Sequence, residues 1–210
     1  AGDYLLIQFG HNDCANGASY YQERFAPLYT KENPATSKSS GFPTIKPTES
    51  MKSETPSALV SQYGATYYSW DCGATYKGYI QYYIDEALAK GAIPVVVSPV
   101  ARLYYSGAAI RTHHDANMTD YEPTLDYLTE NNAYVTACKE VYEENKDKGV
   151  LYIDAYGLTE QMYVDAYTAC GSEANGIAVM DRGDKTHSNK TGGVIQAGLI
   201  AKFIQDSNIS

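Results

Sequence analysis

The chain has 210 residues and a formal net charge of -9 at pH 7. This acidity argues against a nucleic-acid partner, because binding to phosphates requires an excess of Lys and Arg. Hydrophobic residues make up 44% and charged residues 20%, which is typical of a soluble globular domain, and no run approaches the roughly 18 apolar residues of a membrane span. We therefore expect one domain that acts on neutral or weakly charged material and has no membrane partner.

The first third of the chain combines a strand with a long polar insertion. Residues 4–9 are mostly apolar and predict a strand buried in the core, which ends in a Gly-His-Asn-Asp tetrapeptide. Residues 14–75 are rich in Ser, Thr, Pro, Gly and Tyr, and a structureless loop of this length is uncommon inside a compact domain. We expect a surface insertion with some local structure that covers the site. Cys14 and Cys72 flank it and could be joined by a disulfide in an oxidising compartment.

The rest of the chain alternates helix and strand patterns. Apolar residues at helical spacing predict helices at about 76–90, 130–147, 158–169 and 191–206. Continuous apolar runs predict buried strands at about 93–97 and 150–154. Residues 103–128 predict a polar loop, and Cys138 is expected as a buried thiol on the apolar face of its helix. This order predicts an α/β fold of three layers, α/β/α, around a parallel sheet, in which the chemistry lies beyond the carboxyl ends of the strands.

Asp184 and His187 form the first candidate pair, on a loop before the last predicted helix. An Asp at this spacing can turn back and accept the Nδ1 proton of the imidazole. The bond fixes the tautomer and leaves Nε2 as a general base. An ordinary surface loop remains the alternative, because an Asp-x-x-His tetrapeptide also arises by chance.

The tetrapeptide Gly10-His11-Asn12-Asp13 at a strand end is the second candidate. The Asn12 amide is a neutral donor that can point at a developing oxyanion, and Gly10 lets the backbone turn sharply. A plain turn is the alternative, since Gly, Asn and Asp all favour turns. Arg102, just past strand 93–97, could contact a substrate or make a structural ion pair.

The order of these pieces resembles the SGNH (GDSL) hydrolase superfamily. A strand that ends in Gly-x-Asn-Asp and a late Asp-x-x-His before a final helix match the third and fourth signature patches of that family. The matching residues are Gly10, Asn12, Asp13, Asp184 and His187. Segments 8–13 and 91–102 resemble rhamnogalacturonan acetylesterases and related carbohydrate esterases. The resemblance covers most of the chain apart from 14–75 and 103–128.

The resemblance implies a flavodoxin-like fold and acyl transfer by a Ser-His-Asp triad without metal or cofactor. His187 would be the base and Asp184 the carboxylate that orients it. Asn12 and Gly10 would belong to the oxyanion patch. Serine would attack the ester carbonyl, and His187 would return the proton to the leaving sugar hydroxyl.

The resemblance also implies a substrate and a compartment. We expect a secreted deacetylase that acts on acetylated polysaccharide or oligosaccharide, such as plant cell-wall rhamnogalacturonan or xylan, with His11 and Arg102 as substrate contacts. The 21 Tyr, against 4 Phe and 1 Trp, suit sugar surfaces, although many Tyr can simply half-bury on helix faces. A lipase or esterase of the same superfamily and a non-catalytic carbohydrate-binding relative are the alternatives.

The family's Gly-Asp-Ser nucleophile patch does not occur in this sequence. Gly2-Asp3 is followed by Tyr4, and Gly183-Asp184 is followed by Lys185. We expect residues 1–210 to be the C-terminal two-thirds of one SGNH domain, inactive alone. An upstream segment or a complementing chain would supply the serine, and without it the sheet would have an exposed edge.

Two metal-based interpretations are weaker. Asp181-Arg182 and His11-Asn12-Asp13 resemble pieces of metallophosphoesterases, but their order is reversed and the early Asp-x-His of those enzymes is missing. The run at 113–115, His-His-Asp, looks like a metal cluster, yet adjacent residues on an extended loop point apart.

Overall fold

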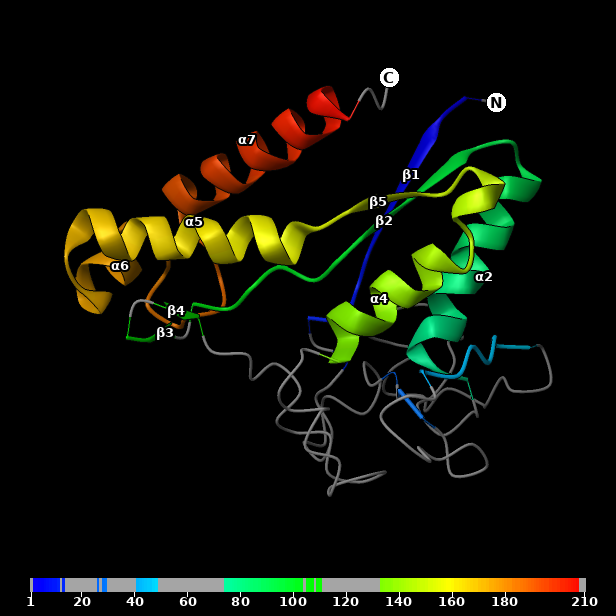
Figure 1. Cartoon of the computed structure of the whole chain (residues 1–210), viewed down its shortest axis with the longest axis horizontal. Coiled ribbons are helices and arrows are strands. Elements are labelled where there is room, and N and C mark those ends of the chain that lie inside the picture. The colour runs from blue at the N-terminus through cyan, green and yellow to red at the C-terminus, as the bar shows by residue number, and fades with distance from the viewer. Residues whose placement is uncertain are drawn as a thin grey trace, which may run out of the picture. The chain divides into compact units, whose positions relative to one another are not determined.

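In this computed structural model the chain adopts a mixed α/β fold with a small parallel sheet, as predicted (Figure 1). The described residues are 2–11, 13, 26, 28–29, 41–48, 74–103, 105–107, 109–110 and 133–207. They divide into two compact units, Ala1–Val97 with His113–Tyr152 and Ser98–Thr112 with Ile153–Ser210, and each unit is described by itself. No helix among these residues combines the length and apolarity needed to cross a membrane.

The sheet contains β1 (Tyr4–Gln8), β2 (Ile93–Val97) and β5 (Leu151–Ile153) in the order β1-β2-β5. β1 and β2 are parallel and in register from Tyr4 opposite Ile93 to Gln8 opposite Val97. The order of the strands in the sheet is therefore their order in the chain.

The prediction that β1 is buried is wrong. Only Ile7 of this strand is buried, and Leu6 is 53% exposed. The physical reason is that β1 is an edge strand, and among the described residues only β2 pairs with it. Its apolar sequence, which is typical of a strand covered on both faces, is thus left partly open to solvent.

Two helices cover the sheet within the first unit, α2 (Tyr76–Ala89) and α4 (Ala133–Glu143). They contact each other and β2, and α2 also contacts β1. Thr75 caps α2, because its Oγ1 accepts the N–H of Gly78 at 3.2 Å. The predicted helix 130–147 is shorter in the structure, since a turn and the 3₁₀ helix η3 (Lys146–Lys148) replace its end before Gly149, which has φ 84°.

The core of the first unit includes side chains from the predicted insertion, so the expectation of a surface segment does not hold for them. These buried residues are Ala26, Leu28, Tyr29 and Phe42. Cys138 is buried as a thiol in the same cluster, where its Sγ lies 3.6 Å from the carbonyl oxygen of Val97, and its prediction is thus confirmed. Cys14 and Cys72 lie outside the described residues.

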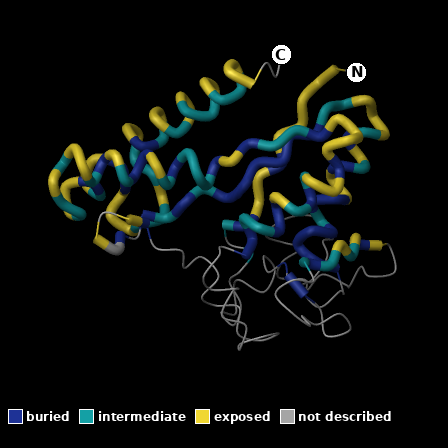
Figure 2. Tube along the Cα trace, viewed as in Figure 1, coloured by how far each residue is buried: buried dark blue, intermediate teal, exposed yellow. Residues whose placement is uncertain are grey.

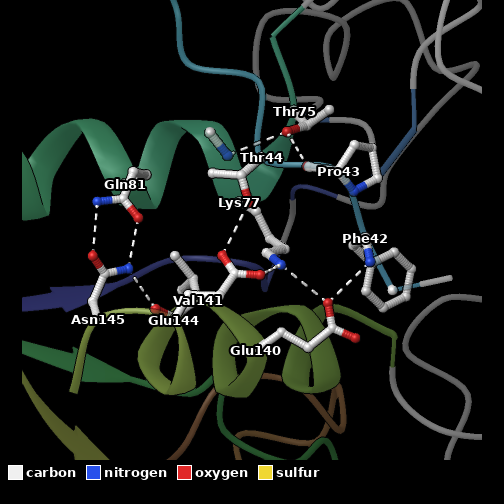
Figure 3. A network of polar contacts seen from close by, with 12 residues as sticks. Phe42, Pro43, Thr44, Thr75, Lys77, Gln81, Glu140, Val141, Glu144 and Asn145 are labelled. Carbon is white, nitrogen blue, oxygen red and sulfur yellow. Dashed lines mark hydrogen bonds and ion pairs between the residues drawn. The ribbon is translucent and has the colours of Figure 1, made fainter. Parts of the chain in front are cut away.

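Buried Lys77 joins α2 to α4 and to segment 41–48 (Figure 3). Its Nζ lies 3.2 Å from Glu140 Oε2 and 2.5 Å from Glu144 Oε1. Glu140 Oε2 also accepts the N–H of Phe42 at 2.9 Å, and Glu144 Oε2 accepts the hydroxyl of Thr44 at 3.2 Å. One ammonium thus pairs with two carboxylates, and both carboxylates also bind segment 41–48.

The described part of the second unit contains a small hairpin and three helices. Strands β3 (Tyr105–Ser106) and β4 (Ala109–Ile110) are antiparallel. Helices α5 (Ala155–Cys170), α6 (Glu173–Met180) and α7 (Lys190–Asp206) pack against one another, and α5 also contacts β4. The hairpin falls in a predicted polar loop and α6 was not predicted, because both are too short to carry a clear period.

Within α7 only Gly192 is buried, and the rest of the helix is half-buried or exposed (Figure 2). An apolar groove with a cavity volume of about 610 Å³ runs between α5 and α7. Its lining includes Met162, Ala166, Leu199 and Phe203. The apolar stripe predicted for 191–206 is therefore present, but the described part of the second unit covers it only in part.

Candidate functional site

The Asp184 carboxylate receives three donors from the residues that follow it. Oδ1 accepts the backbone N–H of His187 at 2.8 Å and of Thr186 at 2.9 Å, while Oδ2 lies 2.7 Å from His187 Nδ1. The two backbone donors fix the carboxylate so that its second oxygen faces the imidazole. The structure thus brings the predicted pair together, on a loop where both side chains are exposed.

These contacts also set the charge of the pair. The backbone N–H of His187, then the ring of His187, then the backbone N–H of Thr186 hold the pKa of Asp184 well below its usual range. The carboxylate is therefore ionised at neutral pH and accepts the Nδ1 proton. Nε2 is then the ring nitrogen that remains to take a proton from a reacting group.

Asp181 braces the loop that holds this pair, a role that was not predicted, since its only signal was the weak resemblance of Asp181-Arg182 to metallophosphoesterases. Its buried carboxylate accepts the N–H of Gly183 at 2.6 Å and of Lys185 at 2.9 Å. Lys185 has φ 63°, a conformation that residues with a side chain rarely adopt. Arg182 N–H donates to the carbonyl of His187 at 3.0 Å and closes the loop. A signal for the turn itself was present, since an Asp followed closely by glycine is typical of a turn.

The segment after β2 supports the same loop from the side. Arg102 Nη1 donates to Thr186 Oγ1 at 3.1 Å, and Leu103 N–H donates to the carbonyl of Lys185 at 3.0 Å. Arg102 is therefore part of the scaffold of the Asp184 loop. Its expected contact with substrate stays a prediction.

The start of α7 fixes the other end of the loop. Asn189 caps this helix, because its Oδ1 accepts the N–H of Gly192 at 3.0 Å. Its Nδ2 donates to the carbonyls of Val179 at 2.9 Å and Asp181 at 3.2 Å. A Cβ on Gly192 would overlap the carbonyl oxygen of Met180, so only glycine fits there without a shift. His187 thus lies two residues before a tightly anchored helix cap.

The second candidate patch lies in the first unit and follows β1. Gly10 has φ 110°, which agrees with the expected need for glycine at this turn. Its N–H donates to Asp13 Oδ2 at 2.7 Å, so the Asp13 side chain closes the turn. His11 is half-buried, and Asn12 lies outside the described residues. Because the pair at 184 and 187 belongs to the second unit, the two patches are described separately.

A metal centre has no candidate residues in the part of the chain that is described. Among these residues no group of three or more His, Cys, Asp or Glu side chains could hold an ion. The predicted alternative at 113–115 lies outside the described residues.

No family model matches the chain, and no curated protein matches it. Among solved structures it is similar to the X-ray structure of protein YxiM from Bacillus subtilis, with 18% sequence identity and a TM-score of 0.43. The match covers 60% of this chain and 29% of that chain. The chain therefore spans less than a third of the length of the solved protein that it matches.

Proposed function

We propose that this chain supplies the base, the orienting carboxylate and the oxyanion turn of a serine ester hydrolase of the SGNH type. The single observation that carries the proposal is the 2.7 Å contact between Asp184 Oδ2 and His187 Nδ1, on a carboxylate that backbone donors hold in place. The braced loop and the capped helix behind it also support the proposal, because they keep the carboxylate and the imidazole in one arrangement.

The proposed reaction follows from the roles of these groups. His187 Nε2 takes the proton of a serine hydroxyl as its oxygen bonds to the ester carbonyl carbon, and the side-chain amide of Asn12 donates to the oxyanion. The intermediate then expels the sugar oxygen, which takes the proton from His187. Water repeats the sequence on the acyl-enzyme and releases the acid. Asp184 stabilises the imidazolium that forms in each half.

The serine of the proposal comes from a segment outside these 210 residues, which contain no Gly-Asp-Ser. β1 supports this, because among the described residues only β2 pairs with it, and Tyr4, Leu5 and Leu6 are exposed. A strand added parallel to β1 would bring its carboxyl end beside Gly10, since parallel neighbours end on the same side of a sheet. With such strands added, the order β1-β2-β5 fits a three-layer, flavodoxin-like fold.

The proposed substrate is an acetylated polysaccharide of the rhamnogalacturonan or xylan type, and the proposed location of the protein is outside the cell. The resemblance of segments 8–13 and 91–102 to carbohydrate esterases supports this choice. A lipase-like ester remains the alternative substrate within the same chemistry, and a panel of esters separates the two.

The test compares the chain alone with the chain joined to a segment that carries Gly-Asp-Ser. We expect no turnover of an acetyl ester by the 210 residues alone, and turnover with release of acetate from acetylated xylan or pectin once they are complemented. His187→Ala should abolish this activity, and Asp184→Asn should lower kcat by about 10³-fold or more. Asp206→Asn, the same change at an exposed carboxylate at the end of α7, should leave the turnover unchanged. Turnover by the isolated chain would refute the proposal.

A carbohydrate-binding role without catalysis is favoured by one observation. Phe9, Tyr82 and Tyr83 expose their rings, and Phe9 stacks on Tyr83 with centroids 5.5 Å apart. Aromatic faces of this kind can pack against sugar rings. A polysaccharide pull-down with His187→Ala separates the two functions: lost turnover with retained binding indicates the enzyme, and no effect on either indicates a binding module.

A further inference from the structure

The turn at Gly10–Asp13 is held at both ends by buried tyrosine hydroxyls. Tyr76 of α2 donates its hydroxyl proton to the carbonyl of Phe9 at 3.0 Å. Tyr134 of α4 places its hydroxyl 3.0 Å from the carbonyl of Asp13 and 2.7 Å from that of Ala26. Each bond joins the turn to a helix far away in the sequence, so the turn does not rely on local contacts alone.

The two tyrosines form one rigid unit. Both are buried in the core of the first unit, and their rings meet edge to face with centroids 4.9 Å apart. Each ring therefore limits the movement of the other. Ala26 N–H also donates to the carbonyl of Asp13, at 3.1 Å, so this carbonyl accepts from both Tyr134 and Ala26.

We propose that Tyr76 and Tyr134 are positioning residues that hold the oxyanion turn in its reactive shape. The catalytic part of this proposal rests on the proposed function, in which the Gly10–Asp13 turn belongs to the oxyanion patch. A turn held at the carbonyls of residues 9 and 13 keeps its donors aimed before the reaction begins. Such preorganisation is what makes an oxyanion site effective.

Packing alone does not require these hydroxyls. A phenylalanine at either position would fill the same core volume without burying a polar group. Burial, together with neighbours such as Cys138 and Asp13, raises the pKa of Tyr76 well above its ordinary value. Its hydroxyl therefore stays protonated and remains a donor over the range in which a histidine base works.

The experiment removes each hydroxyl and keeps each ring, in Tyr76→Phe and Tyr134→Phe. Tyr142→Phe is the matched control, because Tyr142 also lies on α4 but stacks on Tyr152, at 5.2 Å, away from the turn. Amide hydrogen exchange is read by NMR at Gly10 and Ala26, whose N–H groups both donate to Asp13. We expect exchange about tenfold faster or more at Gly10 in the first variant and at Ala26 in the second, with the control unchanged.

The second readout is ester turnover by the complemented protein. With the folded fraction of each variant taken from circular dichroism, we expect kcat per folded molecule to fall about tenfold or more while KM stays within about twofold. A general loss of stability would lower only the folded fraction and would leave kcat per folded molecule unchanged. If the amide exchange rates are unchanged in both variants, the claim that the two hydroxyls hold the turn is wrong. Faster exchange with unchanged kcat would overturn its role in catalysis. If the unaltered complemented protein has no esterase activity, the proposed function fails and the catalytic role falls with it, while exchange still decides whether the hydroxyls hold the turn.

Discussion

Replacing Lys77 by Met tests the polar contact that joins α2, α4 and segment 41–48. Met keeps the length and apolar stem of the side chain and removes the ammonium. Lys77 is 2% exposed, whereas the side chains of Glu140 and Glu144 are 29% and 49% exposed. The change therefore leaves two carboxylates close together without their shared cation, and each can be rehydrated only in part.

The size of the effect follows from these exposures. Breaking a fully buried ion pair costs about 3–5 kcal/mol, and an exposed pair contributes about 0–1 kcal/mol. Because Glu144 is half-exposed and Glu140 keeps the N–H of Phe42, we expect a loss of about 2 kcal/mol in the free energy of unfolding. For a chain of this length that corresponds to a fall in Tm of roughly 4–8 °C.

Urea denaturation followed by far-UV circular dichroism measures this loss. Lys90→Met is the control, because Lys90 pairs with Glu86 at the end of the same helix but both side chains are exposed. The control should change the free energy of unfolding by no more than about 0.5 kcal/mol. If Lys77→Met is as stable as the control, the reasoning about the buried ammonium is wrong.

Three further changes test the glycines and the acid of the site. Gly78→Ala should cost about 1–3 kcal/mol, since its Cβ would overlap the carbonyl of Ile45; urea denaturation equal to wild type would contradict this. Gly192→Ala should shift the start of α7, and the NMR signals of the Asp184 loop should move with it; an unchanged spectrum would count against the close contact. Hydrogen bonds lower the pKa of Asp184 from its ordinary value of 3.8 in the folded state. The stability that this carboxylate contributes is therefore fully present above pH 3.8, and it is lost as the pH falls through the lower pKa of the folded state. In a carbon NMR titration, His187→Ala should raise the Asp184 midpoint, and an unmoved midpoint would deny the contact with the ring.

Much of the secondary structure was predictable because its signals are local. The helix at 76–90, the last helix at 191–206 and the strand at 93–97 follow from apolar spacing, and the structure has them within a residue of those bounds. Elements of only a few residues were not predicted, among them the hairpin of β3 and β4. Two-residue strands carry no period, and only their pairing defines them.

The burial of individual segments was not predictable in the same way. Residues 4–9 have the composition of a covered strand, yet β1 is exposed, because coverage depends on which neighbours the strand has. Conversely, Phe42 lies in a polar insertion and is nevertheless buried in the core. The composition of a segment indicates whether it can be buried, but its neighbours in the tertiary structure determine whether it is buried.

The contact between Asp184 and His187 could be predicted from their spacing, since a tight loop brings a carboxylate and a ring three positions apart close together. The contacts that hold each patch in place could not be predicted, because they come from distant parts of the chain. Arg102 reaches Thr186 across 84 positions, and Tyr134 reaches Asp13 across 121. Bonds of that span form only after the helices and the sheet have packed. The Tyr134 hydroxyl and the Arg102 guanidinium can bond to their acceptors only because the folded chain places each donor next to its acceptor.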